Sequence, residues 1–482
     1  MRSRVRTAVV AIVLGAATAA FPLPAQAATC TYDAPTLTVT VTVGSGESAT
    51  IARSLDLITL DGVSCGAATV QTTDTIVVNG TGGPTEFAID LSGGPFEPGA
   101  TPETDGGASE IEFTVDLSGG TPTLRIAGGP GADHIVLGSG GLNLNAAEAN
   151  GDADVSISGN PAISLVGGGG DDVLSVAGTS GTGPPGPVAT VLGGDGADRL
   201  LGGVGGSTFD GGAGSDEVDY SAAVRLLDAD LAAGRVTHVG GAVDLLSGIE
   251  DLTGSPGDDR IVGDGSDNVI DGGDGVDTID FSAASAMNVD LRAGRAVGDG
   301  TDALSSIENV IGSPFADHIV GSGVANRLEG GPSGDKIDGG GGDDTLTGGD
   351  GIDTVSFQSA TDGVTVSLTN GTANGAGADT LAGFENVVGT PAADEIHGDG
   401  ARNRLDGRRG PDQVSGGGGA DDILGGDGND LLFGQSGNDL LLGDSAKDQL
   451  DGGKDRDVCR GGTGPDSFVF CETVKAGPPR LI

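Results

Sequence analysis

From Gly398 to Val469 the chain reads GDGARNRLD, GRRGPDQVS, GGGGADDIL, GGDGNDLLF, GQSGNDLLL, GDSAKDQLD, GGKDRDVCR and GGTGPDSFV, eight nine-residue frames without a gap. Position 1 is Gly in every frame and position 8 is apolar in every frame. Position 6 is Asp in seven frames and Asn403 in the other. The pattern GGxGxDxUx, with U an apolar residue, is regular enough to decide the fold.

The same nine-residue unit occurs earlier in the chain, in tandem blocks separated by other sequence. Isolated units lie further upstream, GGPGADHIV at Gly128 and GGGGDDVLS at Gly167. The blocks contain three, three, five and nine units, and they cover Gly193 to Asp219, Gly254 to Asp280, Gly312 to Ser356 and Gly389 to Val469. Repetition along most of the chain predicts a stack of similar coils.

The segments between blocks form a second, longer repeat. They open with DYSAA at Asp219, DFSAA at Asp280 and SFQSA at Ser356, so the second interval between openings is longer than the first. The third block has five units where the second has three, which adds 18 residues, and the increase is 15 because the segment before the third block is three residues shorter. The chain has therefore gained a pair of units, which indicates that two units form one complete coil.

The residue types of the unit predict its local structure. Gly at positions 1, 2 and 4 permits a tight turn that other residues cannot follow. Positions 7 to 9 then form a short strand whose single inward side chain is the apolar residue. Two turns and two strands give an 18-residue coil, and successive coils stack as parallel strands about 4.8 Å apart. Asp residues 18 positions apart should therefore lie one above the other.

Such a column of carboxylates is repulsive unless a cation lies between them. Carbonyl and carboxylate oxygens from adjacent turns match the six to eight oxygen ligands that Ca²⁺ prefers. Mg²⁺ fits less well because it requires stricter octahedral geometry, and zinc is disfavoured because clustered His or Cys ligands are lacking. A metal-free, low-complexity linker is the alternative, but it does not explain why position 8 is always apolar.

On these motifs the chain resembles the hemolysin-type calcium-binding repeat family, also called RTX. Frames such as GGDGNDLLF at Gly425 and GGDGADRLL at Gly193 match the family's consensus at every defined position. The resemblance implies an all-β fold, a right-handed parallel β-roll or β-solenoid, with Ca²⁺ as the cofactor. It also implies that position 6 supplies metal ligands, here Asp198, Asp216, Asp259, Asp277, Asp317, Asp335, Asp344, Asp353, Asp394, Asp412, Asp421, Asp430, Asp439, Asp448, Asp457 and Asp466.

Some units depart from the pattern. Ser207 replaces the aspartate of its unit, and Asn268, Asn326 and Asn403 each fill position 6 in the second unit of a block. These neutral positions should bind calcium weakly or not at all. Position 4 is Ala446 in one late unit and Asp455 in the next, where the turn should require Gly.

Composition limits the classes of partner. The chain has 94 Gly, 3% aromatic residues and 70 acidic against 23 basic residues, which gives a formal net charge of -47. A chain with this charge repels itself until cations neutralise it. Nucleic acid and anionic membrane surfaces are disfavoured partners, whereas calcium ions are favoured.

Residues 1–27 have the features of a secretory signal peptide. Arg2, Arg4 and Arg6 precede an apolar run from Ala8 to Ala20, and Ala25-Gln26-Ala27 provides a small-x-small cleavage site. A membrane anchor is the alternative, but the apolar run is short. No later stretch approaches the roughly 20 apolar residues that a membrane span requires. The prediction is an extracellular protein.

The remaining chain divides by composition. Residues 28–127 lack the unit but are rich in β-forming residues, and we expect an irregular β-domain or the start of the solenoid. Sparse repeats follow at 128–192, then the separated blocks at 193–388, the nine-unit calcium-binding roll at 389–470, and a tail or cap at 471–482.

Four cysteines lie in pairs near the two ends of the chain, Cys30 with Cys65 and Cys459 with Cys471. An exported chain with an even cysteine count favours two disulfides, and of three pairings the local one is the simplest. Cys459 occupies an inward position 8. We hypothesise that its disulfide folds the tail over the open end of the roll and covers a strand edge.

No motif predicts catalysis. The GxSxG sequence from Gly62 to Gly66 precedes a Thr- and Val-rich stretch rather than a helix. His134 and His318 occupy position 7 and His397 position 9, where side chains point outward, and His238 is isolated between blocks. We expect a non-enzymatic calcium-binding protein that folds on binding, with a surface-structural or adhesive role toward a cell-surface or matrix component. A secreted enzyme acting on polysaccharides is the alternative.

Overall fold

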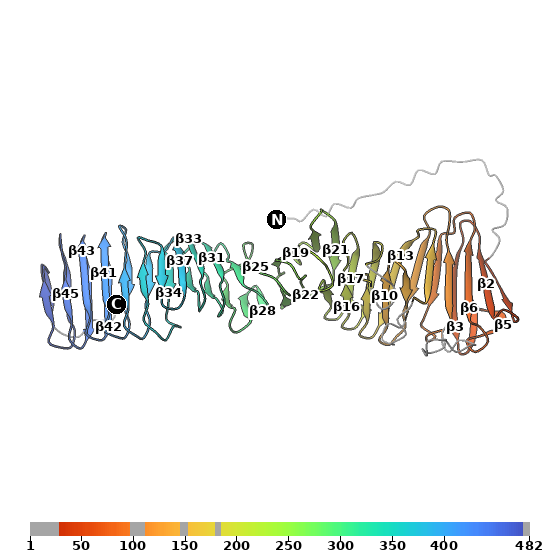
Figure 1. Ribbon diagram of the computed structural model, residues 1–482, viewed down its shortest axis with the longest axis horizontal. Coiled ribbons are helices and arrows are strands. Elements are labelled where there is room, and N and C mark those ends of the chain that lie inside the picture. The colour runs from red at the N-terminus through yellow and green to blue at the C-terminus, as the bar shows by residue number, and fades with distance from the viewer. Residues whose placement is uncertain (1–27, 97–110, 145–152, 179–184, 476–482) are drawn as a thin grey trace, which may run out of the picture.

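The computed structural model describes residues 28–96, 111–144, 153–178 and 185–475. The predicted signal peptide, residues 1–27, and the last part of the predicted tail lie outside these ranges. The described residues form strands and turns, arranged in two long sheets that face each other along an extended solenoid (Figure 1). The strands of residues 28–127 lie at one end and those of the nine-unit roll at the other. Within the described ranges, no helix has the length and apolar character needed to cross a membrane.

Within the described ranges each sheet contains 24 strands, which are given below in the order in which they lie along the molecule. Sheet A consists of β1 (Thr29–Asp33), β2 (Thr38–Val43), β6 (Thr75–Gly80), β8 (Glu112–Asp116), β12 (Val155–Ser158), β11 (Gly141–Asn143), β10 (His134–Gly138), β14 (Val173–Ser175), β16 (Arg199–Leu201), β18 (Glu217–Asp219), β22 (Asp251–Thr253), β24 (Val269–Asp271), β28 (Gly300–Ser305), β27 (Arg295–Gly298), β26 (Asn288–Asp290), β30 (His318–Val320), β32 (Lys336–Asp338), β34 (Thr354–Ser356), β38 (Asn386–Val388), β40 (Arg404–Asp406), β42 (Asp422–Asp427), β44 (Leu440–Ser445), β46 (Val458–Arg460) and β48 (Thr473–Lys475). Sheet B consists of β5 (Val63–Thr69), β4 (Leu57–Leu60), β3 (Ser48–Ser54), β7 (Glu86–Asp90), β9 (Thr123–Ala127), β13 (Ala162–Gly169), β15 (Ala189–Asp195), β17 (Thr208–Ala213), β21 (Val243–Ser247), β20 (Arg235–His238), β19 (Leu227–Asp230), β23 (Arg260–Val262), β25 (Thr278–Asp280), β29 (Asn309–Ile311), β31 (Arg327–Pro332), β33 (Thr345–Asp350), β37 (Ala378–Ala382), β36 (Thr372–Asn374), β35 (Thr365–Ser367), β39 (Glu395–His397), β41 (Gln413–Gly418), β43 (Leu431–Ser436), β45 (Gln449–Asp451) and β47 (Ser467–Val469).

Successive units alternate between the two sheets, so that one coil contains two units. In the nine-unit roll, β43 pairs in parallel with β45, and Leu432 lies opposite Leu450, two units further along the chain. Both side chains point into the core, with relative exposures of 0% and 1%. The predicted two-unit coil and the inward position 8 are thus confirmed, and the fold is the all-β solenoid that the repeat indicated.

The described residues between 28 and 127 form the first coils of the same solenoid. Strands β2, β6 and β8 pair in parallel in sheet A, and β3, β7 and β9 do so in sheet B. These strands have five to seven residues and alternate inward and outward side chains, so that Val39, Val41 and Val43 are all fully buried. Of the two structures expected here, the described part of this region adopts the solenoid start.

Three-stranded antiparallel meanders interrupt the parallel stack at four places. We number them along the chain: the first contains β10–β12, the second β19–β21, the third β26–β28 and the fourth β35–β37. In each, the last strand pairs with the preceding coil and the first strand pairs with the following coil. The strand-like segments between the blocks are the second, third and fourth meanders.

The meanders alternate between the sheets, in the order A, B, A, B. Six, four and six strands of the regular stack lie between consecutive meanders. Because an ordinary coil gives one strand to each sheet, an even number of intervening strands places the next meander in the opposite sheet. The pair of units by which the third block exceeds the second adds two strands, and it therefore leaves this alternation unchanged.

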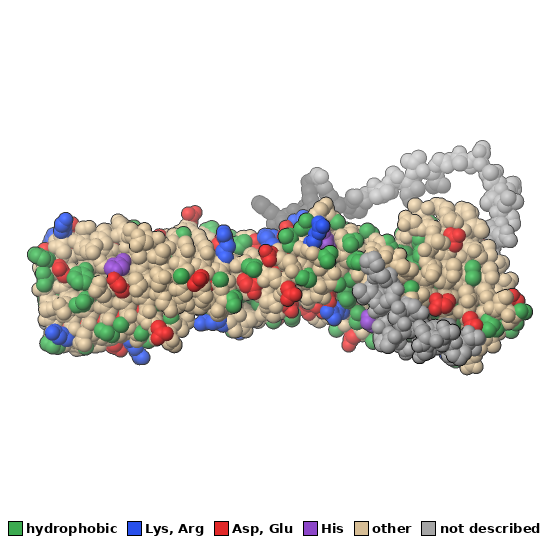
Figure 2. All heavy atoms as spheres, in the orientation of Figure 1, with side chains coloured by type: hydrophobic (Ala, Val, Ile, Leu, Met, Phe, Trp, Pro, Cys, Tyr) green, Lys and Arg blue, Asp and Glu red, His purple; other side chains and the backbone are tan. Residues whose placement is uncertain are grey.

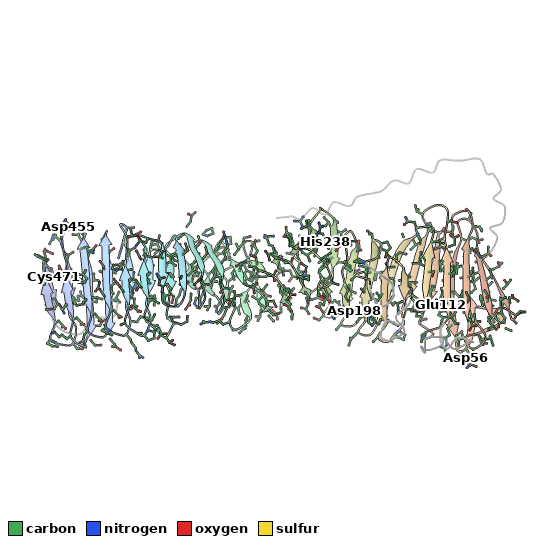
Figure 3. The ribbon with its side chains drawn as sticks, viewed as in Figure 1. Asp56, Glu112, Asp198, His238, Asp455 and Cys471 are labelled. Atoms are coloured by element: carbon green, nitrogen blue, oxygen red, sulfur yellow. A yellow bond between two sulfur atoms is a disulfide. The ribbon has the colours of Figure 1, made fainter. Side chains whose placement is uncertain are left out.

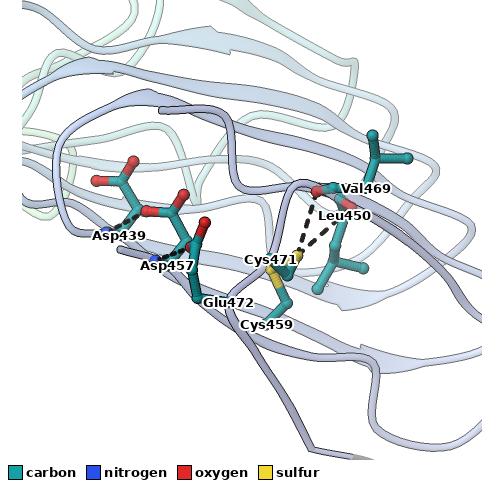
Figure 4. Close-up of a disulfide and its surroundings, with 7 residues drawn as sticks. All are labelled: Asp439, Leu450, Asp457, Cys459, Val469, Cys471 and Glu472. Carbon is teal, nitrogen blue, oxygen red and sulfur yellow. Dashed lines mark hydrogen bonds between the residues drawn. A yellow bond between two sulfur atoms is a disulfide. The ribbon is translucent and has the colours of Figure 1, made fainter. Parts of the chain in front are cut away.

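A disulfide lies near each end of the solenoid. Cys30 in β1 bonds Cys65 in β5, with Cα atoms 5.5 Å apart, and so joins the terminal strands of sheets A and B. Cys459 in β46 bonds Cys471, with Cα atoms 5.9 Å apart (Figure 4). The tail covers the edge of β46, as hypothesised, but it does so by adding β48 to sheet A, and β48 forms the new edge.

Candidate calcium-binding turns

The glycines of the turn serve three distinct geometric purposes, illustrated by the unit that starts at Gly425. A Cβ atom at Gly425 would lie 2.4 Å from Oδ2 of Asp430, so position 1 leaves space for the carboxylate of its own unit. Gly426 has φ of +104°, which favours glycine. A Cβ atom at Gly428 would lie 1.7 Å from the carbonyl oxygen of Gly410 in the preceding coil. The turn therefore packs backbone against carboxylate at close range.

The departures from glycine are accommodated by left-handed backbone. At position 4, Ala446 has φ of 83° and Asp455, labelled at the end of the molecule in Figure 3, has φ of 81°. At position 2, Arg408 and Gln435 both have φ of 72°. L-residues adopt this conformation at a cost of about 1 kcal/mol or more, so the roll keeps the turn geometry despite these substitutions.

One oxygen of each stacked aspartate belongs to a hydrogen-bond ladder. The backbone N–H of Asp412 donates to Oδ1 of Asp430 at 3.0 Å, and the N–H of Asp430 donates to Oδ1 of Asp448 at 3.1 Å. On the opposite edge the N–H of Asp439 donates to Oδ1 of Asp457 at 2.9 Å. Glu472 ends that ladder by accepting from the N–H of Asp457 at 2.7 Å (Figure 4).

The other oxygen, Oδ2, is buried and has no hydrogen-bond partner in most of these residues. Leaving a buried polar atom unpaired costs roughly 1–3 kcal/mol, and more when it is charged. A cation beside each Oδ2 would remove that cost. Unpartnered Oδ2 atoms occur in Asp172, Asp198, Asp216, Asp277, Asp335, Asp344, Asp353, Asp412, Asp421, Asp430, Asp439, Asp448 and Asp457.

Burial also shifts the acidity of these groups. It raises the pKa of Asp344 and of Asp412 to about 7, and neighbouring carboxylates add to the shift. It raises the pKa of Asp421 and of Asp448 to about 6 for the same reasons. Without a cation, Asp344 and Asp412 would therefore be partly protonated near neutral pH, and Asp421 and Asp448 less so.

The donor set fits a hard cation bound mainly by backbone. Among the described residues, no group of three or more His, Cys, Asp or Glu side chains is placed to hold one metal ion. Two stacked aspartates can supply only part of a six- to eight-oxygen shell. Carbonyl oxygens of the glycine turns would have to supply the remainder, which suits Ca²⁺ and not zinc.

Three of the predicted ligands already accept hydrogen bonds from protein groups on both of their carboxylate oxygens. In the first unit of a block, Ser255, Ser313 or Thr390 occupies position 2 and is followed by Pro. The Thr390 N–H donates to Asp394 Oδ2 at 2.7 Å and its hydroxyl donates to Asp394 Oδ1 at 2.8 Å. A meander N–H, that of Val364, donates to the same Oδ1 at 2.9 Å. Asp259 and Asp317 have the same three kinds of partner. We call these three the capped turns.

The asparagine units form a third type of turn. Asn403 accepts from the N–H of Asp399 with its Oδ1 at 2.8 Å, and its Nδ2 donates to the carbonyl of Glu385, in the preceding coil, at 3.0 Å. Asn268 and Asn326 make the equivalent two bonds. The amide Nδ2 donates its own hydrogen bond to a carbonyl, which agrees with the predicted weakness of these positions as metal ligands.

The structure brings the remaining predicted ligands together in short stacks. Where the chain passes from sheet B to sheet A, successive partners are Asp198 with Asp216, Asp335 with Asp353, and Asp421 with Asp439 and Asp457. Where it passes from sheet A to sheet B, the longest stack contains Asp412, Asp430, Asp448 and Asp466. Asp277 and Asp344 lie outside these stacks. A capped turn precedes Asp277 and a glutamate follows it in the ladder. An asparagine turn precedes Asp344 and a meander residue follows it.

Asp172 belongs to this group although the sequence analysis did not select it. The N–H of Asp172 donates to Oδ1 of Asp198 at 2.8 Å, and burial raises the pKa of Asp172 to about 7. The signal was its unit, GGGGDDVLS. Its coil is longer than the regular two-unit coil, because the stretch from Gly178 to Pro187 is inserted before the next aspartate, so the period does not reveal it.

His238, which looked isolated in the sequence, lies in a buried cluster of the second meander (Figure 3). Its Nε2 lies 2.7 Å from Oδ2 of Asp244, which also accepts from the hydroxyl of Tyr220 at 2.9 Å. Asp244 is fully buried, and its Oδ1 accepts from the N–H of Ser207 at 2.6 Å. Asp244 thus accepts the ladder hydrogen bond from Ser207, whose unit lacks an aspartate of its own.

The comparisons with known proteins agree with this geometry. The model of the RTX calcium-binding nonapeptide repeat matches residues 192–222, 246–282, 320–355, 375–414, 397–432, 415–450 and 433–468. No match was found among proteins with curated descriptions. The matched segments between residues 192 and 468 are RTX calcium-binding nonapeptide repeats.

Proposed function

We propose that calcium ions bind between successive aspartate turns and that this binding drives the repeat blocks to fold. The observation that carries the proposal is the row of buried Oδ2 atoms without partners, thirteen of them in register with the coils. Burying charged carboxylates without a counter-ion opposes folding, whereas an ion shared by two turns links them. The free energy of binding then contributes directly to the stability of the fold.

Far-UV circular dichroism of the purified full chain tests this proposal. We expect weak β signal from the repeat blocks in EGTA and a cooperative gain when calcium reaches about the millimolar range typical of extracellular sites. Magnesium at the same concentration should produce a smaller change. An identical spectrum and melting temperature with calcium and with EGTA would refute calcium-driven folding.

We infer that the protein works outside the cell as a structural or adhesive rod and not as a catalyst. The two disulfides support an oxidising compartment. The extended solenoid supports a role based on surface rather than on an enclosed site (Figure 1). The serine of the GxSxG sequence, Ser64, lies on strand β5 and not at a turn that leads into a helix, and its hydroxyl donates to the carbonyl of Gly66 at 2.8 Å. This placement supports a non-catalytic role.

A pull-down from intact cells and cell-wall material, performed with calcium and with EGTA, tests the adhesive role. We expect retention in calcium and release in EGTA. Equal retention under both conditions would separate adhesion from the calcium-dependent fold. No retention under either condition would contradict the adhesive role while leaving calcium binding intact.

A further inference from the structure

A shallow groove of about 390 Å³ lies beside the fourth meander, on the outer side of sheet B. One side is formed by β35 and β36, with Thr365, Thr372 and Asn374 among its lining residues, and the other includes His397 and Gln435. All eleven lining residues carry a hydroxyl, an amide or an imidazole, or are glycine. The volume falls within the range of small-molecule sites.

The groove combines an uncharged lining with a polar one, whereas the uncharged groove beside the first meander is lined partly by Leu137, Ile157 and Ile163. In a chain with 70 acidic residues, none of the lining side chains is Asp, Glu, Lys or Arg. Figure 2 shows one face of the molecule, where acidic, basic and hydrophobic side chains are scattered along the solenoid. His397 is the only titratable residue that lines the groove, and its Nε2 lies 3.0 Å from Oε1 of Glu395 beside it.

The other sheet B meander and the third meander show what this position ordinarily contains. In the third meander Asp290 pairs across the strands with Arg295, and in the second Asp230 pairs with Arg235. In the fourth meander the same register holds Ser367 opposite Thr372. The first residue of each pair accepts an N–H from three positions later, so the turn is capped alike in all three. The fourth meander therefore lacks the charged pair of the other two but keeps the same turn.

Several polar groups in the groove have no partner within the described part of the chain. No hydrogen bond is formed by the hydroxyls of Thr365 and Thr372 or by the side-chain amides of Asn374 and Gln435. The Ser367 hydroxyl accepts from an N–H of the turn, and the Thr369 hydroxyl donates to the carbonyl of Gly398. Hydroxyl and amide groups both donate and accept. The free groups therefore offer mixed donors and acceptors to a ligand.

We propose that this groove binds a neutral, hydroxyl-rich glycan. The lack of basic side chains and the net charge disfavour an anionic ligand, the lack of carboxylates disfavours a cation, and the lack of apolar side chains disfavours a lipid. A neutral sugar chain presents hydroxyls that both donate and accept, which matches the lining. This assignment rests on the proposed adhesive function, for which it names the ligand class.

Formation of the groove depends on the calcium-binding roll. The floor and far side contain Ser415, Gly417 and Gln435, which lie in units of the nine-unit block. Strand β35 of the meander pairs in parallel with β39, and β39 pairs with β41. We therefore expect glycan binding only when calcium is present.

The decisive variant is the double substitution Ser367→Asp with Thr372→Arg, which installs the charged pair of the third meander. Because Asp230 and Asp290 cap the same turn, the variant should fold with an unchanged calcium midpoint. The matched control is Asp290→Ser with Arg295→Thr, which removes the pair from the third meander and leaves the groove untouched.

The measurement is binding to an array of neutral and uronate-containing glycans in calcium and in EGTA, with circular dichroism of the same samples. We expect calcium-dependent binding to neutral glycans, unchanged in the control and reduced roughly tenfold or more in the variant, equivalent to losing about two hydrogen bonds. Folded, calcium-loaded protein that binds no neutral glycan, or a variant that binds as well as the wild type, would overturn the assignment. Failure to fold with calcium would instead contradict the proposed function.

Discussion

Each stacked aspartate uses its two carboxylate oxygens for different purposes. Oδ1 of Asp448, for example, accepts the N–H of Asp430 and so fixes the spacing of adjacent coils. Its Oδ2 is buried without a partner and faces the turn. One side chain therefore makes a structural contact that needs no metal and also buries an unpaired carboxylate oxygen that a metal ion could bind. Substitutions that separate the two oxygens distinguish these contributions.

The substitution Asp430→Asn should weaken calcium binding while leaving the ladder in place. Its Oδ1 can still accept from Asp412, while its Nδ2 would replace Oδ2, the oxygen proposed to bind calcium, with a hydrogen-bond donor. We expect the calcium midpoint, followed by circular dichroism, to rise by roughly tenfold, or about 1.4 kcal/mol. Asn403→Ala is the control, and it should lower the melting temperature equally with and without calcium. An unchanged midpoint for Asp430→Asn would show that Oδ2 is not a ligand.

The raised pKa values predict that acid partly replaces calcium. A carboxyl group whose pKa is higher in the folded chain stabilises that chain when it is protonated. For Asp344, Asp412, Asp421 and Asp448 this contribution is complete below about pH 4, and it is lost as the pH rises through about 6 to 7.

In calcium-stripped buffer the β signal should therefore increase as the pH falls from 8 to 5. With calcium present, protons compete for the same oxygens, and the calcium midpoint should rise over that range. Loss of β structure on acidification of the calcium-free protein would contradict both statements.

At this scale the sequence predicted which residues stack but not which of them need a metal. The 18-residue period correctly placed Asp412, Asp430 and Asp448 in one column. The capped turns were not predicted, because position 6 is Asp in both kinds of unit. The available signal was the Ser or Thr followed by Pro at positions 2 and 3, as in Thr390, whose hydroxyl replaces an external ligand.

The capped turns and the meanders occur together as elements that need no calcium. Each capped aspartate accepts an N–H from the residue that precedes, or from the first residue of, a meander's first strand, as Asp394 does from Val364. A meander closes its own hydrogen bonds through antiparallel pairing. The stacks that we propose to bind calcium are therefore separated by junctions that are held by protein groups alone.

Thr390→Val should destabilise a junction independently of calcium. The substitution preserves the shape of the buried side chain but removes the hydroxyl that donates to Asp394. We expect a loss of about 1.5–3 kcal/mol in unfolding free energy, the range for a hydrogen bond to a charged group, at saturating calcium as well as in EGTA. The control Thr380→Val, at an exposed position of β37, should change stability by less than about 0.5 kcal/mol. An effect confined to low calcium would mean that Asp394 binds metal.

The meanders show what alternation of residues can and cannot predict. The alternation of apolar and polar residues in Val289 to Leu291 and in Val364 to Leu368 is typical of strands, and these stretches overlap β26 and β35. Their antiparallel partners were not predicted, because alternation identifies a strand's faces but not its neighbours. The first meander, which begins at His134, lacks the DYSAA-type opening and gave no sequence signal.

On the scale of the molecule, the even count of strands between meanders predicts which deletions are tolerated. Removing Gly321 to Asp338 takes out one coil and leaves four strands between the third and fourth meanders, as between the second and third. We expect this variant to fold with calcium and to be shorter by about one strand spacing of 4.8 Å, measured by small-angle X-ray scattering.

Removing only Gly330 to Asp338 should fail, because it leaves an odd number of strands and directs the fourth meander toward the wrong sheet. We expect a lower melting temperature and a less cooperative calcium transition. If both deletions behaved alike, the coil would not be the unit by which this fold can be lengthened or shortened.

Because the meanders alternate between the sheets, the protein can change in length while the direction in which its groove faces stays fixed. Gains and losses of whole coils change the distance between the groove beside β35 and the disulfide-joined strands β1 and β5, in steps of about 4.8 Å. They do not turn the groove to the opposite face. Recombination between such similar repeats can therefore tune the reach of the molecule while the direction in which it presents its ligand stays the same.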